Sequence, residues 1–436
     1  MNQLVKPKKG FKFEKWLFGK EIEIPEEWER VTLIEKCESK PKYGANVSAI
    51  EKNPELPRYI RITDLNDDGS LRDEEWKSIP EEDAKDYILN ENDILFARTG
   101  ATVGKTFLYQ KTHGRCAFAG YLIRFKPEDK KLEPKFLFYW THSKYYWSWL
   151  SSIKTQGVQP NVNAEQYSDM PLLCPPLPEQ QKISEIISRV DQLIISTQNV
   201  IEQTRLLKRG IMQKLLSKGI GHKKFKKIKW LFGKELEIPD EWNIKKIEEI
   251  GEIVSGGTPD STNKNYWSGE ILWAIPTDIT KIKSNFIEDT ERKITKQGLD
   301  NSSAKLLPVG AILITSRATI GECVITLKQI STNQGFQNLI CNKNFDNFFI
   351  YYLIKYYQNN FLRVSQGTTF LEISKTEIKK ILLPVPNSKD EQQKIATILS
   401  NIDSQITTQS QYKEKLERLK ISLMQKLLTG EVRVKV

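Results

Sequence analysis

The sequence of 436 residues has few of the residues on which metal sites, disulfides and membrane spans depend. It contains three histidines, and its five cysteines are scattered without a C-x-x-C pair, so neither a zinc site nor a disulfide framework is expected. No stretch approaches the roughly 18 consecutive apolar residues of a membrane-spanning helix. The first residues, MNQLVKPKKGFKFEKW, lack the apolar core of a signal peptide. The sequence therefore predicts a cytoplasmic protein.

Motifs that carry chemistry are also missing. There is no G-x-G-x-x-G fingerprint, no H-E-x-x-H, and no Asn or Asp before Pro-Pro and an aromatic, as in DNA methyltransferases that methylate amino groups. The stretch from Gly100 to Thr106 resembles a phosphate-cradling loop, but three residues separate its glycines where four are needed. The matching stretch, Gly321-Glu322-Cys323, has no lysine. We interpret both as structural turns and expect no catalysis, metal or cofactor on this chain.

What the sequence does contain is a long amphipathic run from Glu179 to about Ser217. Apolar or small residues recur every seventh position, which predicts a long helix packed against a second helix. At 1.5 Å per residue, the roughly 39 residues would extend about 58 Å. We predict that the helix-pair interface consists of Ile183, Ile186, Val190, Leu193, Val200 and Leu207 from this run and Ile395, Ile398, Ile402, Leu416 and Leu419 from a second run. Ile187, Ile194 and Ile201 are expected to widen it.

The second run is a repeat of the first. EQQKI occurs at 179–183 and 391–395, and MQKLL occurs at 212–216 and 424–428, both at an offset of 212. A second repeat precedes each globular stretch, because WLFGKEIEIPEEW at 16–28 returns as WLFGKELEIPDEW at 230–242. Repetition on this scale indicates a duplicated architecture. We therefore expect the two long helices to pair within the same chain.

Between these repeats the two copies diverge, and each looks like a mixed α and β region. Residues 94–98 and 311–315 are predicted buried strands, and aromatic-rich helices are predicted at 135–150 and 348–362. The predicted fold class is α+β, with two tandem mixed α/β domains separated by two long antiparallel coiled-coil helices and an internal pseudo-two-fold repeat. We expect four segments: a domain at 1–175, a helix at 176–220, a second domain with its basic linker at 221–386, and a helix at 387–436.

The net charge of +11 suggests a polyanionic partner. Ten lysines and arginines and no acid lie between Arg205 and Lys229, so the rest of the chain is nearly neutral. This basic stretch is either a solvated linker between domains or part of a contact with nucleic acid, and the two roles are compatible. Elsewhere, any contact with nucleic acid must use side chains placed locally.

The duplicated architecture, the entry PLPEQQKI, the exit MQKLL and the head I-P-[E/D]-E-W resemble the specificity subunit of type I restriction-modification systems. The likeness covers nearly the whole chain. It implies two target-recognition domains that read the two halves of a split, asymmetric DNA site, and two helices that set their spacing. It also implies two methyltransferase subunits and two motor-nuclease subunits as partners. Adenine methylation at N6, S-adenosylmethionine, ATP and Mg²⁺ would then belong to those partners.

Candidate DNA-contacting residues follow from polar loops at matched places in the two copies. Arginine and lysine reach guanine or phosphate, and amide side chains pair with adenine. The candidates in the first copy are Arg98, Thr99, Thr102, Lys105, Lys154, Gln156, Gln159, Asn161 and Asn163. Those in the second copy are Ser316, Arg317, Thr319, Gln366, Thr368 and Thr369.

Two alternatives remain open from the sequence. A coiled-coil adaptor that tethers proteins would explain the long helices without any DNA role. An enzyme in its own right, such as a DNA methyltransferase, would need motifs that the sequence lacks. Methyl transfer by the purified chain alone would favour the enzyme. Retention of a specific DNA sequence in the presence of the methyltransferase partner would speak against the adaptor.

Overall fold

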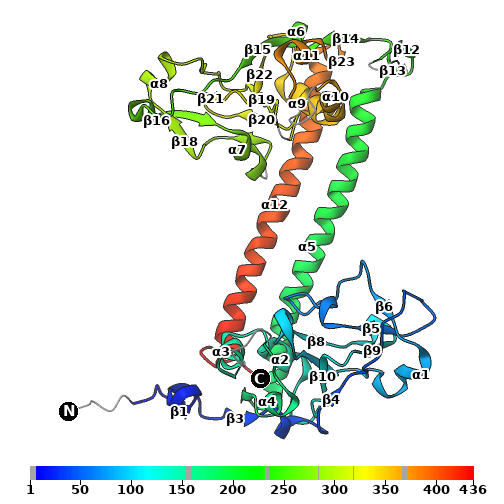
Figure 1. Cartoon of the computed structure of the whole chain (residues 1–436), viewed down its shortest axis with the longest axis vertical. Helices are drawn as coiled ribbons and strands as arrows, with labels where there is room; N and C mark the ends of the chain where they lie inside the picture. Colours follow the sequence, from blue (N-terminus) through cyan, green and yellow to red (C-terminus); the bar gives the residue numbers. More distant parts are fainter. Residues whose placement is uncertain are drawn as a thin grey trace. The chain divides into compact units, whose positions relative to one another are not determined.

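The computed structural model describes residues 6–153, 160–230, 233, 235–282, 284–317, 319–365 and 372–436 (Figure 1). The chain divides into two compact units, unit 1 with residues 1–196 and 413–436, and unit 2 with residues 197–412. This division differs from the four consecutive segments expected from the sequence, because the end of the chain packs with its beginning. Among the described residues, no helix is both long enough and apolar enough to cross a membrane.

Unit 1 is built on small sheets that flank short helices. Strands β4, β10, β7 and β8 pair in that order, β5 lies between β6 and β9, and β3 pairs with β11. The strands are β1 (Phe11–Lys15), β2 (Glu21–Pro25), β3 (Glu29–Thr32), β4 (Lys42–Tyr43), β5 (Arg58–Ile60), β6 (Lys77–Ser78), β7 (Ile94–Ala97), β8 (Thr106–Leu108), β9 (Cys116–Phe118), β10 (Leu122–Phe125) and β11 (Pro171–Cys174). The helices are α1 (Glu81–Ala84), α2 (Pro134–Trp140), α3 (Lys144–Ile153), α4 (Ala164–Ser168) and the long α5 (Leu177–Lys218).

Unit 2 repeats this plan. Strands β15, β22, β19, β20 and β17 pair in that order, β16 lies between β18 and β21, and β14 pairs with β23. The strands are β12 (Phe225–Lys229), β13 (Glu235–Pro239), β14 (Trp242–Lys246), β15 (Gly251–Ser255), β16 (Trp267–Ala274), β17 (Phe286–Ile287), β18 (Arg292–Ile294), β19 (Ile312–Ile314), β20 (Cys323–Thr326), β21 (Ile330–Thr332), β22 (Gln337–Cys341) and β23 (Leu382–Pro386). The helices are α6 (Ile247–Ile250), α7 (Pro276–Lys281), α8 (Lys296–Asp300), α9 (Asn347–Tyr356), α10 (Gln358–Val364), α11 (Lys375–Lys380) and the long α12 (Lys389–Leu427).

The duplication is therefore visible in the strand pairing as well as in the sequence. In each unit a parallel pair, β5 with β9 or β16 with β21, lies beside a larger sheet with a fully buried inner strand, β7 or β19. That sheet is antiparallel in unit 1, and in unit 2 it is antiparallel except for β17, which pairs in parallel with β20. The predicted strands at 94–98 and 311–315 correspond to β7 and β19. The mixed α/β character predicted for both copies is confirmed.

Aromatic side chains fill the core of each unit. Helices α2 and α3 bury Trp140, Tyr146 and Trp149, and α9 buries Tyr351 and Tyr352. Their faces pack against strands and against the long helices. These buried aromatic faces therefore belong to the core and are not exposed platforms for bases.

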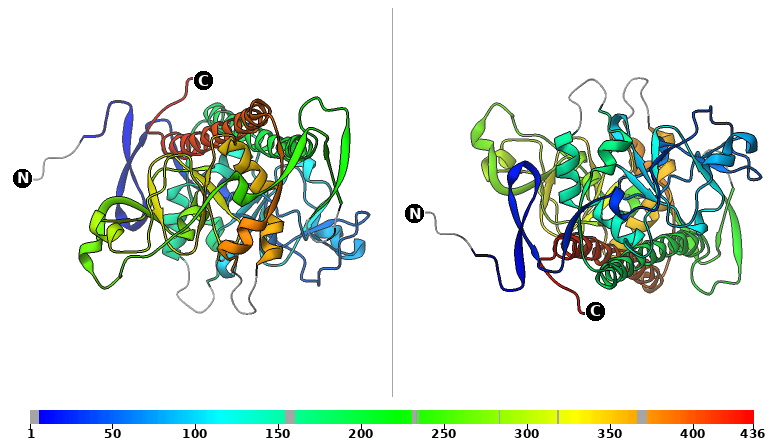
Figure 2. Two further views of the ribbon diagram at one scale, coloured as in Figure 1. Left: turned by 90° about the horizontal axis from the view of Figure 1, so that it is seen from above. Right: turned by 90° about the horizontal axis from the view of Figure 1, so that it is seen from below.

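A two-stranded ribbon precedes each unit's core. Strands β1 and β2 pair in the first ribbon, and β12 and β13 pair in the second, with the same register. Figure 2 shows both ribbons as hairpins that stand out from their own units. Trp16 of the first ribbon packs edge-on against Trp140 and Tyr145, and Trp230 of the second packs against Tyr357. The repeated head motif is thus a tethered hairpin in both copies.

Helices α5 and α12 are long and uninterrupted, with 42 and 39 residues (Figure 1). In unit 1, Ile183 and Ile187 of α5 share a core with Met424 and Leu427 of α12. In unit 2, Leu216 of α5 shares a core with Ile395, Ala396 and Leu399 of α12. The start of each helix therefore packs near the end of the other, which is an antiparallel arrangement.

The structure corrects one row of the predicted helix-pair interface. Ile183, Val190, Ile395, Ile402 and Leu416 are buried, and Ile186 is half-buried. The remaining predicted positions are exposed: Leu193 (46%), Val200 (44%), Leu207 (58%), Ile398 (39%) and Leu419 (47%). The row that accompanies Ile183 and Val190 is instead Ile187, Ile194, Ile201, Lys208 and Leu215, all buried or half-buried. The second row of the seam thus lies four residues after the first, not three.

The basic stretch from Arg205 to Lys229 is helix and ribbon. Its first part completes α5, and its last part is strand β12. Lys208 and Lys218 are ion-paired with Asp403 and Glu237. Part of the charge that the sequence suggested for nucleic acid is therefore neutralised within unit 2.

Candidate nucleic-acid interface

In unit 1, the loop after β7 is held by backbone hydrogen bonds to two other segments. The Arg98 amide donates to the Tyr121 carbonyl at 3.0 Å, and the Val162 amide donates to the Arg98 carbonyl at 2.8 Å. Thr99 forms an antiparallel bridge with Asn161. These contacts bring two separate groups of candidates, the turn after β7 and the segment before α4, to one place.

An arginine and two tyrosines lie together at this loop. The Arg98 guanidinium lies 4.9 Å from the centre of the Tyr43 ring, and its Nε is buried without a hydrogen-bond partner among the described residues. The rings of Tyr43 and Tyr121 are 39% and 60% exposed. Stacked arginine and exposed aromatic rings are groups that contact bases and phosphates. Neither tyrosine was predicted from the sequence, although Tyr43 follows the basic stretch Lys40-Pro41-Lys42.

Two further candidates at this turn have partners within unit 1. Lys105 Nζ lies 2.7 Å from the Asp67 carboxylate and donates to the Leu65 carbonyl. The Thr102 hydroxyl donates to the Thr99 carbonyl at 3.2 Å. Asp67 is almost fully exposed, and the Lys105 ammonium holds the pKa of its carboxyl below the usual value. This lysine is thus bound to the loop from residue 65 to 67, which supports a structural role for the Gly100 turn.

Asn163 occupies a structural position. It is the N-cap of α4, where its side chain accepts from the Gln166 amide at 2.8 Å and the Gln166 side chain accepts from the Asn163 amide at 2.9 Å. Such a reciprocal capping box satisfies two otherwise unpaired amides at a helix start. Asn161, two residues earlier, has a buried Oδ1 without a partner among the described residues.

Unit 2 has the same backbone frame with different side chains. The Ser316 amide donates to the Gly335 carbonyl at 2.8 Å, the Ile373 amide donates to the Ser316 carbonyl at 3.0 Å, and Arg317 bridges Glu372. Ser316 thus takes the place of Arg98, and Arg317 takes the place of Thr99.

Side chains at this second frame also differ in exposure. Ser316 is completely buried, so its hydroxyl has no surface to offer a ligand. Arg317 is half-exposed and its Nε lies 2.9 Å from the Glu372 carboxylate. Thr319 is exposed with a positive φ of 48°, and its carbonyl accepts from the Thr315 hydroxyl. The candidates Lys154, Gln156, Gln159, Gln366, Thr368 and Thr369 lie outside the described residues.

The repeated Glu-Gln-Gln at the start of each long helix ties the helix to its own unit. Glu179 is 2% exposed and accepts from Trp28 Nε1 at 3.1 Å and from Arg433 Nε at 2.7 Å. Glu391 accepts from Trp242 Nε1 at 3.3 Å and lies 2.9 Å from His222 Nε2. The motif thus joins the head tryptophan, the helix start and the segment that follows the end of the other helix.

The following glutamine makes a second matched contact. Gln180 Oε1 accepts from the Glu133 amide at 2.8 Å, and Gln392 Oε1 accepts from the Asp346 amide at 2.8 Å. Both donating amides lie just before the aromatic helices α2 and α9. Each long helix is therefore fixed to the start of the aromatic helix of its unit by the same glutamine.

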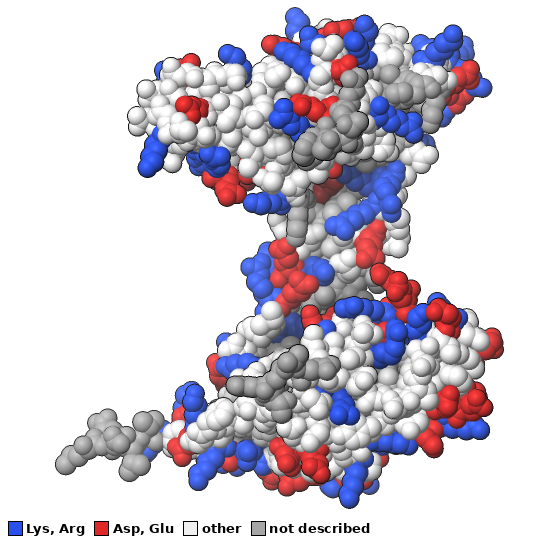
Figure 3. All heavy atoms as spheres, viewed as in Figure 1, with Lys and Arg blue, Asp and Glu red and all other residues white. Residues whose placement is uncertain are grey.

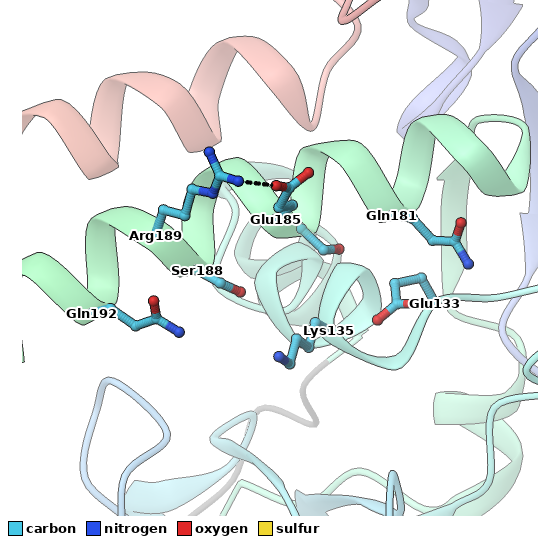
Figure 4. Close-up of a pocket in the computed structure, with 8 residues that line it drawn as sticks. Glu133, Lys135, Gln181, Glu185, Ser188, Arg189 and Gln192 are labelled. Carbon is cyan, nitrogen blue, oxygen red and sulfur yellow. Dashed lines mark hydrogen bonds and ion pairs between the residues drawn. The ribbon is translucent and has the colours of Figure 1, made fainter. Parts of the chain in front are cut away.

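A polar hollow of about 330 Å³ lies on α5 beside α2 (Figure 4). Gln181, Glu185, Arg189 and Gln192 line it from α5, where Glu185 and Arg189 form an ion pair one helical turn apart. Its groups are amides, hydroxyls and paired charges of neighbouring turns, and no group of side chains in the described part of the chain is arranged to hold a metal ion. The hollow is best understood as part of the junction between α2 and α5.

Charge on the surface is mixed. On the face shown in Figure 3, lysines and arginines alternate with aspartates and glutamates over each unit. A contact with DNA would therefore depend on particular side chains, as the near-neutral composition outside residues 205–229 suggested.

Comparison with known proteins identifies the family. The family model described as "Type I restriction modification DNA specificity domain" matches residues 25–204 and again residues 239–418. The MjaX specificity subunit of a type I restriction enzyme from Methanocaldococcus jannaschii is 30% identical over 430 residues, which is 95% of each chain. The MjaIX specificity subunit of the same organism is 39% identical over 189 residues, so this chain aligns with 44% of that relative.

A solved structure supports the same fold. The S subunit of a type I restriction-modification system from M. genitalium superposes with a TM-score of 0.59 at 16% identity, over 92% of this chain and 96% of that one. Because the family model matches twice and one relative aligns over nearly its whole length, the chain belongs to the DNA specificity subunits of type I restriction-modification systems.

Proposed function

We propose that each unit reads one half of a split, asymmetric DNA site, and that the long helices set the spacing between the halves. The chain would direct N6-adenine methylation or restriction, with catalysis in partner subunits. The observation that carries the proposal is the shared loop frame with different partly exposed side chains, Arg98 at one position of the frame in unit 1 and Arg317 at the next position in unit 2. Two readers of different half-sites need this combination of a constant backbone and different polar groups.

We propose Arg98, with Tyr43 and Tyr121 beside it, as the DNA-contacting cluster of unit 1, and Arg317 as its counterpart in unit 2. Arg98 and Arg317 occupy adjacent positions of the shared frame. An arginine that pairs with a guanine contributes about 1–3 kcal/mol of discrimination, which is roughly five- to 150-fold.

The test maps methylated adenines in cells that carry this chain and its cognate methyltransferase. Arg98→Ala should relax or abolish recognition of one half of the motif, and Arg317→Ala should affect the other half. Each variant is the other's matched control. If both variants changed the same half, or neither changed the motif, the assignment of one half-site to each unit would be wrong.

We further propose that two methyltransferase subunits dock on the exposed apolar rows of the long helices. On α5 the row contains Leu193, Val200 and Leu207, and on α12 it contains Ile398, Tyr412 and Leu419. Ile186, Val200 and Leu207 have the same positions in the repeat as Ile398, Tyr412 and Leu419. Equivalent rows on equivalent helices would suit two copies of one partner. Two motor-nuclease subunits would complete the restriction complex.

Docking is tested with Val200→Asp, compared with Asn199→Asp on another face of the same helix. The first should reduce co-purification of the methyltransferase while the chain keeps its helix content, and the second should not. Equal retention of the partner by both variants would argue against this surface. S-adenosylmethionine, ATP and Mg²⁺ are proposed to bind on the partner subunits, and the complex is proposed to act in the cytoplasm.

A further inference from the structure

In unit 1, a tyrosine, an aspartate and a lysine from three helices meet. The Tyr139 hydroxyl of α2 donates to Asp191 Oδ2 of α5 at 2.8 Å. Lys420 Nζ of α12 lies 2.6 Å from Asp191 Oδ1 and 5.8 Å from the centre of the Tyr139 ring. Tyr139 is buried, and about a quarter of each charged side chain remains exposed.

Unit 2 contains the same triad. The Tyr352 hydroxyl of α9 donates to Asp403 Oδ2 of α12 at 2.7 Å, and Lys208 Nζ of α5 lies 2.5 Å from Asp403 Oδ1. Lys208 also lies 5.4 Å from the centre of the Tyr352 ring. Asn285 Nδ2 adds a third donor to the Asp403 carboxylate at 2.7 Å.

The two triads are related by the internal repeat. Asp403 and Lys420 follow Asp191 and Lys208 at the same 212-residue offset as the two EQQKI motifs. In one unit the aspartate is on α5 and the lysine on α12, and in the other these roles are exchanged. Both ion pairs thus link the two long helices, and both tyrosines link a globular core to that pair.

Both lysines occupy rows of the seam that are otherwise largely apolar. Lys208 continues the row of Ile187, Ile194 and Ile201, and Lys420 lies between Leu416 and Leu423 on the buried side of α12. An ion pair removed from water has a desolvation cost that well-packed apolar residues would not incur, so such pairs add little net stability. Their well-attested effect is to select one register, since any slip leaves a charge without its partner.

We propose that Tyr139–Asp191–Lys420 and Tyr352–Asp403–Lys208 are positioning residues that fix the helix register and hold each recognition domain on the helices, and thereby set the spacer between half-sites. The inference rests on the proposed function. A slip of one helical turn moves a side chain by about 5.4 Å, and one base pair extends about 3.4 Å. For a helix pair that lies along the DNA axis, a slip of one turn would change the spacer by one to two base pairs.

The experiment uses the full chain assembled with its methyltransferase on duplexes whose half-sites are separated by the cognate spacer or by one or two base pairs more or fewer. The measured quantity is the ratio of methylation at altered spacers to methylation at the cognate spacer. Lys208→Met and Lys420→Met should each raise this ratio by about tenfold, equivalent to 1.4 kcal/mol. Lys208→Arg, which keeps the charge, should leave it unchanged.

Lys182→Met provides the matched control, because Lys182 pairs with Glu185 on its own helix, at 2.9 Å, and forms no ion pair with a second helix among the described residues. Tyr352→Phe removes a single hydroxyl and tests the same triad if a lysine variant fails to fold. We expect it to raise the ratio by less than the lysine variants do. A general loss of folding would lower methylation at every spacer and leave the ratio constant. An unchanged ratio in folded Lys208→Met and Tyr352→Phe would overturn the proposal. Failure of the proposed function would give a different result, because methylation at a split motif would then not depend on the presence of the chain at all.

Discussion

The carboxylate of Glu179 gives the sharpest quantitative prediction, because it is almost completely buried and has two donors. Arg433 Nε lies 2.7 Å from Glu179 Oε1 and its terminal nitrogen 2.9 Å from Oε2, while Trp28 donates to Oε2 at 3.1 Å. In Arg433→Met the carboxylate keeps only the tryptophan among these donors. Breaking a fully buried pair costs about 3–5 kcal/mol. Because the arginine side chain is 36% exposed, solvent reduces the expected cost to about 2 kcal/mol.

The assay is hydrogen–deuterium exchange of the full chain, followed peptide by peptide by mass spectrometry. A loss of about 2 kcal/mol should increase opening at the start of α5 by about 30-fold. Peptides of unit 2 are the internal control, because there Glu391 is bound by His222 and Trp242 instead. In the double variant Glu179→Gln with Arg433→Met, no unpaired buried charge remains, so protection should recover by at least half. If Arg433→Met left exchange unchanged, or if the double variant exchanged as fast as the single one, the argument from an unpaired carboxylate would be refuted.

Three further predictions concern burial. Val190→Asp places a charge in the buried seam and should lower the free energy of unfolding by at least about 3 kcal/mol, measured as a lower thermal midpoint in circular dichroism melts. Leu193→Asp, at a position 46% exposed, should change the free energy of unfolding by no more than about 0.5 kcal/mol in the same assay. Burial raises the pKa of the Cys323 thiol to about 12, so the folded chain keeps a proton that the unfolded chain releases near pH 8.5. The contribution of Cys323 to stability should thus fall by about 1.4 kcal/mol per pH unit above pH 9, so that urea titrations at pH 8 and 10 should show a smaller loss in Cys323→Ala than in the unaltered chain. Gly104→Ala should destabilise unit 1 by more than about 1 kcal/mol in urea titrations, because Gly104 has a φ of +93° and a Cβ would lie 2.1 Å from Leu150; an unchanged midpoint would contradict this.

The helix seam shows where sequence patterns suffice and where they do not. The row of Ile183 and Val190 follows from seven-residue spacing and is buried as expected. The sequence placed apolar residues both three and four positions after this row, and it did not show that the row four positions on is the buried one. The contact that decides between them, Lys208 with Asp403, joins residues far apart in the sequence and cannot be read from periodicity.

The candidate site shows the same division. The matched turns after β7 and β19 were found because buried strands and a repeated turn predict where loops emerge. The surroundings of individual side chains were not predictable. Ser316 is buried, and its carbonyl accepts a hydrogen bond from the Ile373 amide. Lys105 forms an ion pair with Asp67, which lies in a loop distant in the sequence. The residue types of Ser316 and Lys105 are compatible with a contact to DNA. Their neighbours in the folded structure determine whether such a side chain is accessible to a ligand.

The division of the chain into units has a consequence for its synthesis. Unit 2 is a continuous segment, residues 197–412, so all of its contacts are present once that segment has left the ribosome. Unit 1 joins residues 1–196 with residues 413–436, and its core includes Met424 and Leu427 beside Ile183. Residues 1–196 must therefore wait, with part of their apolar surface uncovered, until residues 413–436 are translated. At about 5–20 residues per second this delay lasts on the order of 10 to 50 s, a period in which a chaperone or a bound partner would protect the unfinished unit.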